Sequence, residues 1–303
     1  MAEKEASLTD RIAEQLDDLD AYATLYAKHL ASAAEVAVRA DDPVDTLSVI
    51  KLPILALAYR DIEAGTLDLE ARCLIRPEDL RNGTGWLKRF DVGLQPTLRD
   101  VLKQMIISSD NTATDLVLSR VGGIERVNSL LAEFGYRETR MQNTLAGYFH
   151  RRWISADPSN ASMTDHEVFV RGFPSDENSA ARSFALEGDP AEWLGRSTAR
   201  EMGRFAEQIQ TAQLTTRQRS DEMIDLLCQQ QSTSRLPRRI GRRVVIGHKT
   251  GDMGPVAGND VGVIYADSGP IVVALFVNQN RGDFDEVEET QGRVAEILFD
   301  TWG

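Results

Sequence analysis

The sequence contains few of the residues that define several common classes of protein. Two cysteines, Cys73 and Cys228, are too few for a disulfide framework, and each is predicted to be a small buried apolar residue. Basic residues number 34 against 47 acidic ones, and the net charge of −13 argues against a nucleic-acid partner, which needs clustered lysine and arginine. The four histidines lack the spacing of a helical metal-binding motif. We therefore expect no nucleic-acid partner, no metal and no cofactor.

Long apolar runs and a leader pattern are also missing. The first ten residues show no basic stretch followed by an apolar one, and no segment is as long as a membrane span. We expect a cytoplasmic protein with no membrane partner, or a periplasmic or secreted one if a leader was removed. The 303 residues, of which 42% are hydrophobic, suffice for one large domain or two interleaved ones.

The order of strand-like and helix-like segments predicts a mixed α/β (α+β) fold. Two β-branched, apolar segments come first, at residues 22–30 and 34–40, and three come last, at 243–250, 260–266 and 270–277. Helical periodicity fills most of the chain between them. The simplest assembly is one five-stranded antiparallel sheet, built from both ends of the chain and flanked by helices, with an all-helical domain inserted.

This assembly divides the chain into a discontinuous sheet domain and a helical domain. We assign residues 1–47 and 211–303 to the sheet domain and residues 48–210 to the helical domain. Helical spacing with polar breaks runs from 63 to 140. The least regular stretch, 141–196, carries seven aromatic residues, too many for a disordered tract. It is predicted to be an ordered insertion, either a lid over a site or a packed surface element at a dimer contact.

The first of three strings that can do chemistry is Ser48-Val49-Ile50-Lys51. Residues three apart share a helical face, so the Lys51 amine can reach the Ser48 hydroxyl, and a helix N-terminus favours negative charge there. The backbone N–H groups of Ser48 and Asp252 would form an oxyanion hole. Taken alone, this string is equally typical of surface polarity at a helix cap.

The second string, Ser109-Asp110-Asn111, lies where one predicted helix ends and the next begins. Ser109 can relay a proton, and the Asn111 amide can hold a substrate carbonyl or amide. Asp110 is predicted to cap the following helix, and the alternative extends that capping role to all three residues.

The third string, Lys249-Thr250-Gly251, lies on a predicted strand. Lys249 can lower the pKa of Lys51 by like-charge proximity, which leaves a neutral amine able to act as a base. Thr250 can hold a substrate carboxylate, and Gly251 lets a substrate lie close to the backbone. The alternative is an ordinary strand end.

In this order the three strings resemble the signature of class A β-lactamases and penicillin-binding proteins. The resemblance extends from about Tyr22 to Trp302, and the similar segments include residues 97–100, 109–116, 197–202, 248–251, 259–261 and 270–274. It implies a helical domain beside a sheet domain, in agreement with the assembly above.

The resemblance also implies a role for each residue of the site. Ser48 would be the acylated nucleophile and Lys51 its general base, while Ser109 would assist proton transfer to the leaving nitrogen. Asn111 and Lys249 would position the substrate. The carboxylate of the substrate would bind Thr250. Trp86 would be an aromatic residue at the mouth of the cleft, or alternatively a residue with only a packing role.

Two departures from the family pattern bear on the substrate. The family's Glu-x-x-Leu-Asn string, which activates the deacylating water, is absent between residues 141 and 196, although four glutamates occur there: Glu167, Glu177, Glu187 and Glu192. Lys51 is therefore the stronger candidate for general base, and deacylation is expected to be atypical.

Asp252, where the family has a small neutral residue, would repel a substrate carboxylate held by Thr250 unless it points to solvent. Our hypothesis is a neutral or cationic amide or ester as natural substrate.

The leading hypothesis is a serine hydrolase of the class A β-lactamase type. It would form a covalent acyl-enzyme by cleaving the C–N bond of a small amide such as a β-lactam, and esterase activity would be possible. Two alternatives remain: a peptidase or transpeptidase like the penicillin-binding proteins, and a sensor that is acylated and keeps its ligand.

Overall fold

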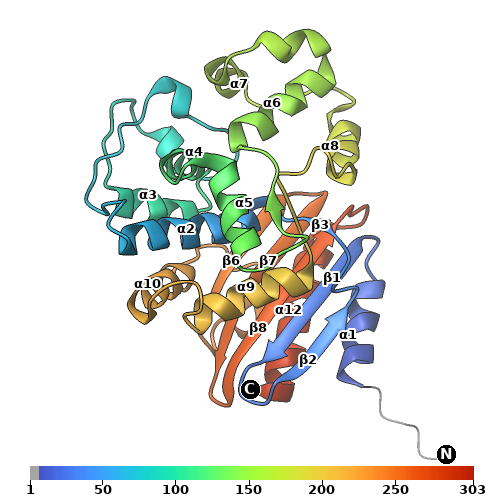
Figure 1. Cartoon of the computed structure of the whole chain (residues 1–303). Coiled ribbons are helices and arrows are strands. Elements are labelled where there is room, and N and C mark those ends of the chain that lie inside the picture. The colour runs from blue at the N-terminus through green and yellow to red at the C-terminus, as the bar shows by residue number, and fades with distance from the viewer. Residues whose placement is uncertain (1–6) are drawn as a thin grey trace, which may run out of the picture.

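Strands from the two ends of the chain form one antiparallel sheet in a computed structural model, which describes residues 7–303 (Figure 1). The strand order is β2-β1-β8-β7-β6. The strands are β1 (Tyr22–His29), β2 (Ala34–Val38), β6 (Ile246–Met253), β7 (Ala257–Ala266) and β8 (Gly269–Asn278). β1 pairs with β8 along its whole length, from Tyr22 opposite Asn278 to His29 opposite Ile271. The five-stranded antiparallel sheet predicted from the sequence is confirmed.

Helices cover both faces of this sheet. On one face lie α1 (Leu8–Asp17), α11 (Pro237–Ile240) and α12 (Phe284–Trp302), and α9 (Ala199–Gln210) crosses the other (Figure 1). The central strand β8 supplies alternate side chains to two apolar clusters: Ile271, Val273, Leu275 and Val277 to the α12 side, and Val272, Ala274 and Phe276 to the α9 side. Because β8 is buried on both faces, its sequence is continuously apolar rather than alternating.

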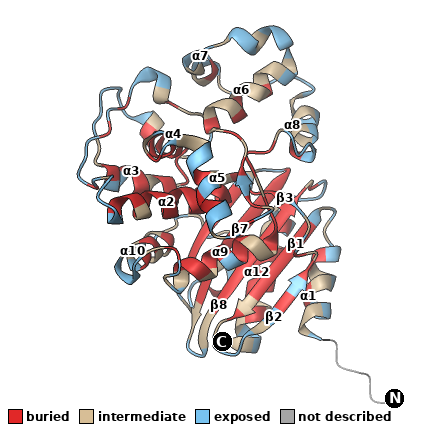
Figure 2. Ribbon diagram, in the orientation of Figure 1, coloured by how far each residue is buried: buried red, intermediate tan, exposed pale blue. Residues whose placement is uncertain are grey.

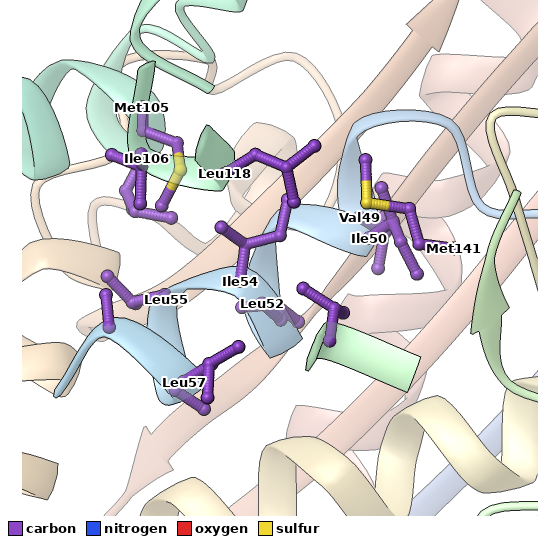
Figure 3. Close-up of a cluster of buried hydrophobic side chains, with 14 of the residues drawn as sticks. Val49, Ile50, Leu52, Ile54, Leu55, Leu57, Met105, Ile106, Leu118 and Met141 are labelled. Carbon is purple, nitrogen blue, oxygen red and sulfur yellow. The ribbon is translucent and has the colours of Figure 1, made fainter. Parts of the chain in front are cut away.

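The helical part of the chain packs around one buried helix. Its helices are α2 (Lys51–Glu63), α3 (Leu98–Ile107), α4 (Asn111–Arg120), α5 (Gly123–Glu133) and α10 (Arg217–Leu227). Helix α2 is apolar on nearly every side, and its leucines and isoleucines meet side chains of α3 and α4 (Figures 2 and 3). A helix that is apolar all round is expected in a core. This packing fixes the start of α2, where two of the predicted site residues lie.

The segment from residue 66 to 96 differs from the prediction of helices separated by polar breaks. It is a long connection with only two short 3₁₀ turns, η2 (Pro77–Asp79) and η3 (Leu87–Arg89). Gly83, Gly85 and Gly93 all adopt positive φ angles, which end helices and favour turns. The connection runs over the outside of α3 and α4 toward the cleft.

The stretch 141–196 is more regular than expected. It contains α6 (Leu145–Ala156), η4 (Pro158–Ser162), α7 (Asp165–Arg171) and α8 (Ser179–Gly188). Thr144 and Thr164 start two of these helices as side-chain N-caps. The three α-helices stand over one end of the sheet (Figure 1).

A second, small sheet that the sequence did not indicate closes the base of this insertion. Its order is β3-β5-β4, with β3 (Val44–Asp45), β4 (Arg140–Met141) and β5 (Gly195–Ser197). The insertion therefore leaves and rejoins the body on neighbouring strands. Helix α9, placed in the helical domain by the sequence, packs on β1, β7 and β8, and the proposed division of the chain stays a prediction. No helix within residues 7–303 is long and apolar enough to cross a membrane.

Candidate active site

Ser48 lies in a short 3₁₀ turn, η1 (Leu47–Ile50), that leads directly into α2. Val49 and Ile50 are fully buried and anchor this turn beside Met141 (Figure 3). Leu47 has a positive φ of 46°, and its N–H donates to Asp45 Oδ1 at 3.0 Å. The Ser48 side chain borders a cavity, and its hydroxyl makes no hydrogen bond within residues 7–303. The nucleophile predicted from the sequence is thus accessible to a bound molecule.

The amine of Lys51, one turn after Ser48, is completely buried and holds the second string in place. Its Nζ donates to the Ser109 carbonyl oxygen at 2.7 Å and to Asn111 Oδ1 at 2.9 Å, and it lies 3.1 Å from Ser109 Oγ. The two carbonyl-type oxygens can only accept, while the hydroxyl can donate or accept. A neutral amine can therefore keep both donated bonds and still have its lone pair free for a proton.

Lys249 approaches the same hydroxyl from β6. Its Nζ donates to Ser109 Oγ at 2.9 Å and to the Thr250 carbonyl oxygen at 2.7 Å. Burial, and then the neighbouring charge of Lys249, hold the pKa of Lys51 well below its usual value. Burial likewise lowers the pKa of Lys249, to about 7. The sequence named like-charge proximity as the cause, but desolvation is the larger one here.

No hydrogen bond joins Lys51 to the Ser48 hydroxyl in the described part of the chain, although the spacing brings the two side chains to one side of the helix start. Catalytic hydrogen bonds are often long in a free enzyme and tighten only when substrate binds. Proton transfer from Ser48 to Lys51 thus stays a prediction.

The junction between α3 and α4 aims Ser109 at the two lysines. Ser109 has a positive φ of 53°, and its carbonyl oxygen accepts from Thr84 Oγ1 at 2.7 Å as well as from Lys51. Asp110 caps α4 by accepting from the Ala113 N–H at 2.8 Å, as predicted. The capping alternative for all three residues does not hold, because Ser109 and Asn111 bond to the buried lysines instead.

Gly251 allows two backbone segments to pack closely, and its expected contact with a substrate stays a prediction. A Cβ at this position would lie 2.7 Å from the Thr46 carbonyl oxygen and 3.2 Å from the Ser48 nitrogen. The missing side chain therefore lets β6 pack directly on the turn that carries the nucleophile. The Ser48 N–H lies next to this strand, as an oxyanion hole shared with Asp252 requires.

Asp252 neither points freely into solvent nor carries an unbalanced charge. Its carboxylate pairs with Arg235, whose side chain is only 1% exposed, while that of Asp252 is 35% exposed. Arg235 also donates to the Asn259 carbonyl oxygen at 3.0 Å and lies 3.6 Å from Glu288. The repulsion that we expected beside Thr250 is therefore reduced, because a buried guanidinium compensates the Asp252 carboxylate.

Two neighbouring hollows, which share Asp252, divide the predicted residues between them. One is a cavity of about 420 Å³ under the insertion, bordered by Ser48, Asn111 and Asp252 together with apolar and polar side chains of α6 and α8. The other is more open and is bordered by Ser109, Thr250 and Asp252, with Trp86 at its rim. Trp86 is 52% exposed, as a residue at a cleft mouth should be.

Sequence reasoning missed three charged residues near the nucleophile. Arg152 of α6 borders the cavity. Glu187 of α8 is only 2% exposed, unlike the other glutamates of the insertion, and its Oε1 has no partner within the described chain. Asp45 is completely buried, which raises its pKa to about 7. No local sequence signal separates these residues from surface charges.

Comparison with known proteins identifies the family of this chain. The model of the β-lactamase enzyme family matches residues 7–302, which is nearly the whole chain. This chain belongs to the β-lactamase enzyme family. It is a serine hydrolase of the β-lactamase type, as predicted from the three strings.

Individual relatives have low sequence identity to this β-lactamase family chain, but they align with most of its length. It is 25% identical to β-lactamase L2 of Stenotrophomonas maltophilia over 274 residues, covering 89% of this chain and 78% of the relative. A β-lactamase of Streptomyces lavendulae is 24% identical over 286 residues, covering 92% and 81%.

Solved structures of this family share the fold. A β-lactamase from Sphaerobacter thermophilus superimposes with a TM-score of 0.78 at 22% identity, covering 98% of this chain and 96% of that one. PBP-A superimposes with a TM-score of 0.76 at 22% identity, covering 97% and 95%, and a variant of PBP-A has been solved as an acyl-enzyme with penicillin G.

Proposed function

We propose that this enzyme cleaves the C–N bond of small amides, β-lactams among them, through a covalent acyl-enzyme on Ser48. One observation carries the proposal: two buried lysines with lowered pKa values converge on the Ser109 hydroxyl beside an accessible serine. A buried neutral amine is a competent general base, whereas an exposed lysine at neutral pH is not. The same site would also accept activated esters.

The chemistry proceeds in two balanced steps. In acylation, Ser48 Oγ bonds to the substrate carbonyl carbon as its proton passes to Lys51, and the C–N bond breaks as the nitrogen takes a proton through Ser109. In deacylation, water adds to the ester carbon, one of its protons returns to Ser48 Oγ, and the free acid leaves. The N–H of Ser48 would stabilise the oxyanion in both steps.

We infer that the second step is slow. Three of the four glutamates in the insertion are exposed or engaged: Glu167 caps α7, Glu177 lies at the surface and Glu192 pairs with Arg151 at 2.8 Å. Glu187 is buried, and burial raises its pKa, but it follows Leu186 on α8 and does not border the cavity itself. No glutamate of the insertion is therefore placed as a ready base beside Ser48, and the Asp252 carboxylate, which borders the same cavity, is paired with Arg235.

Intact-protein mass spectrometry after mixing with penicillin G tests this proposal. We expect a mass increase equal to one whole penicillin, because ring opening releases no fragment, and we expect it to persist for many turnover times of an efficient β-lactamase. Ser48→Ala should show no adduct. An adduct that forms equally in Ser48→Ala would remove Ser48 from the role of nucleophile.

A second function is favoured by the same geometry. A peptidase or transpeptidase like the penicillin-binding proteins needs acylation but no dedicated deacylating base, and PBP-A is among the structures similar to this chain. Release of amine from small peptide amides, with transfer of the acyl group to an added amine, would favour it. A permanent adduct with no turnover of any amide or ester would instead favour the sensor.

A further inference from the structure

Two buried arginines lie near the nucleophile, and only one of them has a carboxylate partner. Arg235, under β6, is paired with Asp252 and lies near Glu288, so its charge is already compensated. Arg152, on α6, forms no ion pair with any carboxylate of residues 7–303, although it is only 9% exposed. A buried guanidinium without a counter-charge is costly and points to a missing anion.

The known contacts of Arg152 leave most of its donors unused. Nη1 donates to the Tyr148 carbonyl oxygen at 3.0 Å, and Nη2 lies 3.5 Å from the weakly accepting sulfur of Met253. The guanidinium stacks on the Tyr148 ring with 3.8 Å between its central carbon and the ring centroid. Of the five N–H groups of an arginine, two are thus engaged. The Tyr148 hydroxyl, buried next to it, has no partner within the described chain other than this guanidinium.

The nearest acidic groups do not neutralise Arg152 fully. The charge of Arg152 reaches Asp45 and counteracts part of the rise in its pKa, but no ion pair within 4.0 Å joins Arg152 to Asp45 or Glu187 among the described residues. Burial raises the pKa of both carboxyls, to about 7 for Asp45, so the negative charge of Asp45 is incomplete at neutral pH.

The position of Arg152 identifies which part of a substrate would meet it. Arg152 borders the cavity under the insertion with Ser48 and Asn111, whereas Ser109, predicted to protonate the leaving nitrogen, borders the more open hollow. The acyl part of a substrate would therefore occupy the cavity under the insertion. Phe149 and Phe173 line it edge to face, with ring centroids 5.4 Å apart, which suits an apolar or aromatic spacer.

We propose that Arg152 is the subsite for a negatively charged group at the far end of the acyl part of the substrate. The preferred substrate would be an amide or ester whose acyl group has an apolar spacer and an anionic end. This inference rests on the proposed acylation of Ser48 and names the substrate class of that site.

The test compares two p-nitrophenyl esters that differ in one group. One carries para-carboxyphenylacetyl and the other the neutral para-carbamoylphenylacetyl group. We expect the wild-type enzyme to acylate about 10- to 100-fold faster with the carboxylate, the range for hydrogen bonds to a charged group. Arg152→Gln should bring the ratio close to one, and Arg152→Lys should restore part of it.

Arg182→Gln is the matched control, because Arg182 borders the same cavity but is already paired with Asp176 at 2.6 Å. It should keep the wild-type ratio. Equal rates with the two esters in the wild-type enzyme, or an unchanged ratio in Arg152→Gln, would overturn the proposal, and so would a loss of preference in Arg182→Gln alone. Ser48-dependent hydrolysis of the neutral ester would at the same time leave the acyl-enzyme chemistry intact.

A binding measurement decides the matter if neither ester reacts. The acetamides of the same two acids are added to the Ser48→Ala and Ser48→Ala/Arg152→Gln enzymes, and thermal unfolding is followed. The anionic amide should raise the Tm of the first enzyme more than the neutral amide does and should not do so in the second. Equal shifts in both enzymes would rule out the subsite.

Discussion

Replacing Asp45 by asparagine should stabilise the enzyme in a strongly pH-dependent way. Asp45 lies on β3 behind the nucleophile turn, where burial raises its pKa to about 7 and the charge of Glu187 contributes. Its Oδ1 accepts the Leu47 N–H, and its Oδ2 has no partner within residues 7–303. Asparagine keeps an accepting oxygen for Leu47 but cannot ionise, so the substitution isolates the cost of the charge.

The magnitude follows from the shift of the pKa. A carboxyl whose pKa rises on folding binds its proton more tightly in the folded state, so its contribution to stability falls as pH rises from about 4 through about 7. Moving the pKa from about 3.9 to about 7 costs about 4 kcal/mol at alkaline pH, and about 2–3 kcal/mol of this develops between pH ~5 and pH ~8.

Urea denaturation of both proteins at these two pH values measures the effect. The free energy of unfolding of wild type relative to Asp45→Asn should fall by this amount as the pH is raised. Asp91→Asn is the control, because Asp91 is exposed and its side chain makes no hydrogen bond in the described chain. The same difference between wild type and Asp45→Asn at both pH values would refute the reasoning, because it would mean that Asp45 titrates normally.

Three further predictions concern the site. Lys51→Met should slow acylation by penicillin G at least about 100-fold, the usual contribution of a general base. The acylation rate of the wild-type enzyme should rise with pH as the lysines lose their proton. Stopped-flow measurements across pH check both, and a rate that does not change with pH argues against a lysine base. Gly251→Ala should lower the free energy of unfolding by about 1–3 kcal/mol, because its Cβ would lie 2.7 Å from the Thr46 carbonyl oxygen; unchanged urea midpoints contradict this. Trp86→Ala should change the free energy of unfolding by less than about 0.5 kcal/mol while raising KM for substrates with large leaving groups. A KM equal to that of the wild-type enzyme would show that Trp86 does not contact the substrate.

The sequence predicted most of the fold because its signals were local and consistent. The strands of the main sheet were each marked by β-branched residues between turns, and Asp110 marked a helix start that the structure confirms with a capping hydrogen bond. The long connection at 66–96 was misread because its spaced apolar residues imitate helical periodicity while its glycines adopt turn conformations.

The sequence predicted which residues belong to the site but not how their charges are balanced. Lys51, Ser109, Asn111 and Lys249 carried recognisable strings, and the hydrogen bonds among them follow from the packing of α2, the α3–α4 junction and β6. The charge balance was not predictable in the same way. Whether Asp252 repels a substrate depends on a partner 17 residues earlier in the chain, and only the fold brings the two together.

The pairing of β1 with β8 has a consequence for how the enzyme is made. β1 and β2 can pair with each other early, but the edge of β1 that faces β8 has no partner until nearly the whole polypeptide has been synthesised, because Tyr22 pairs with Asn278. Lys249 also arrives late, long after Ser48. A nascent chain stalled before β6 would thus contain Ser48 but neither Lys249 nor the strand that packs on the Ser48 turn. Such a chain would be inactive.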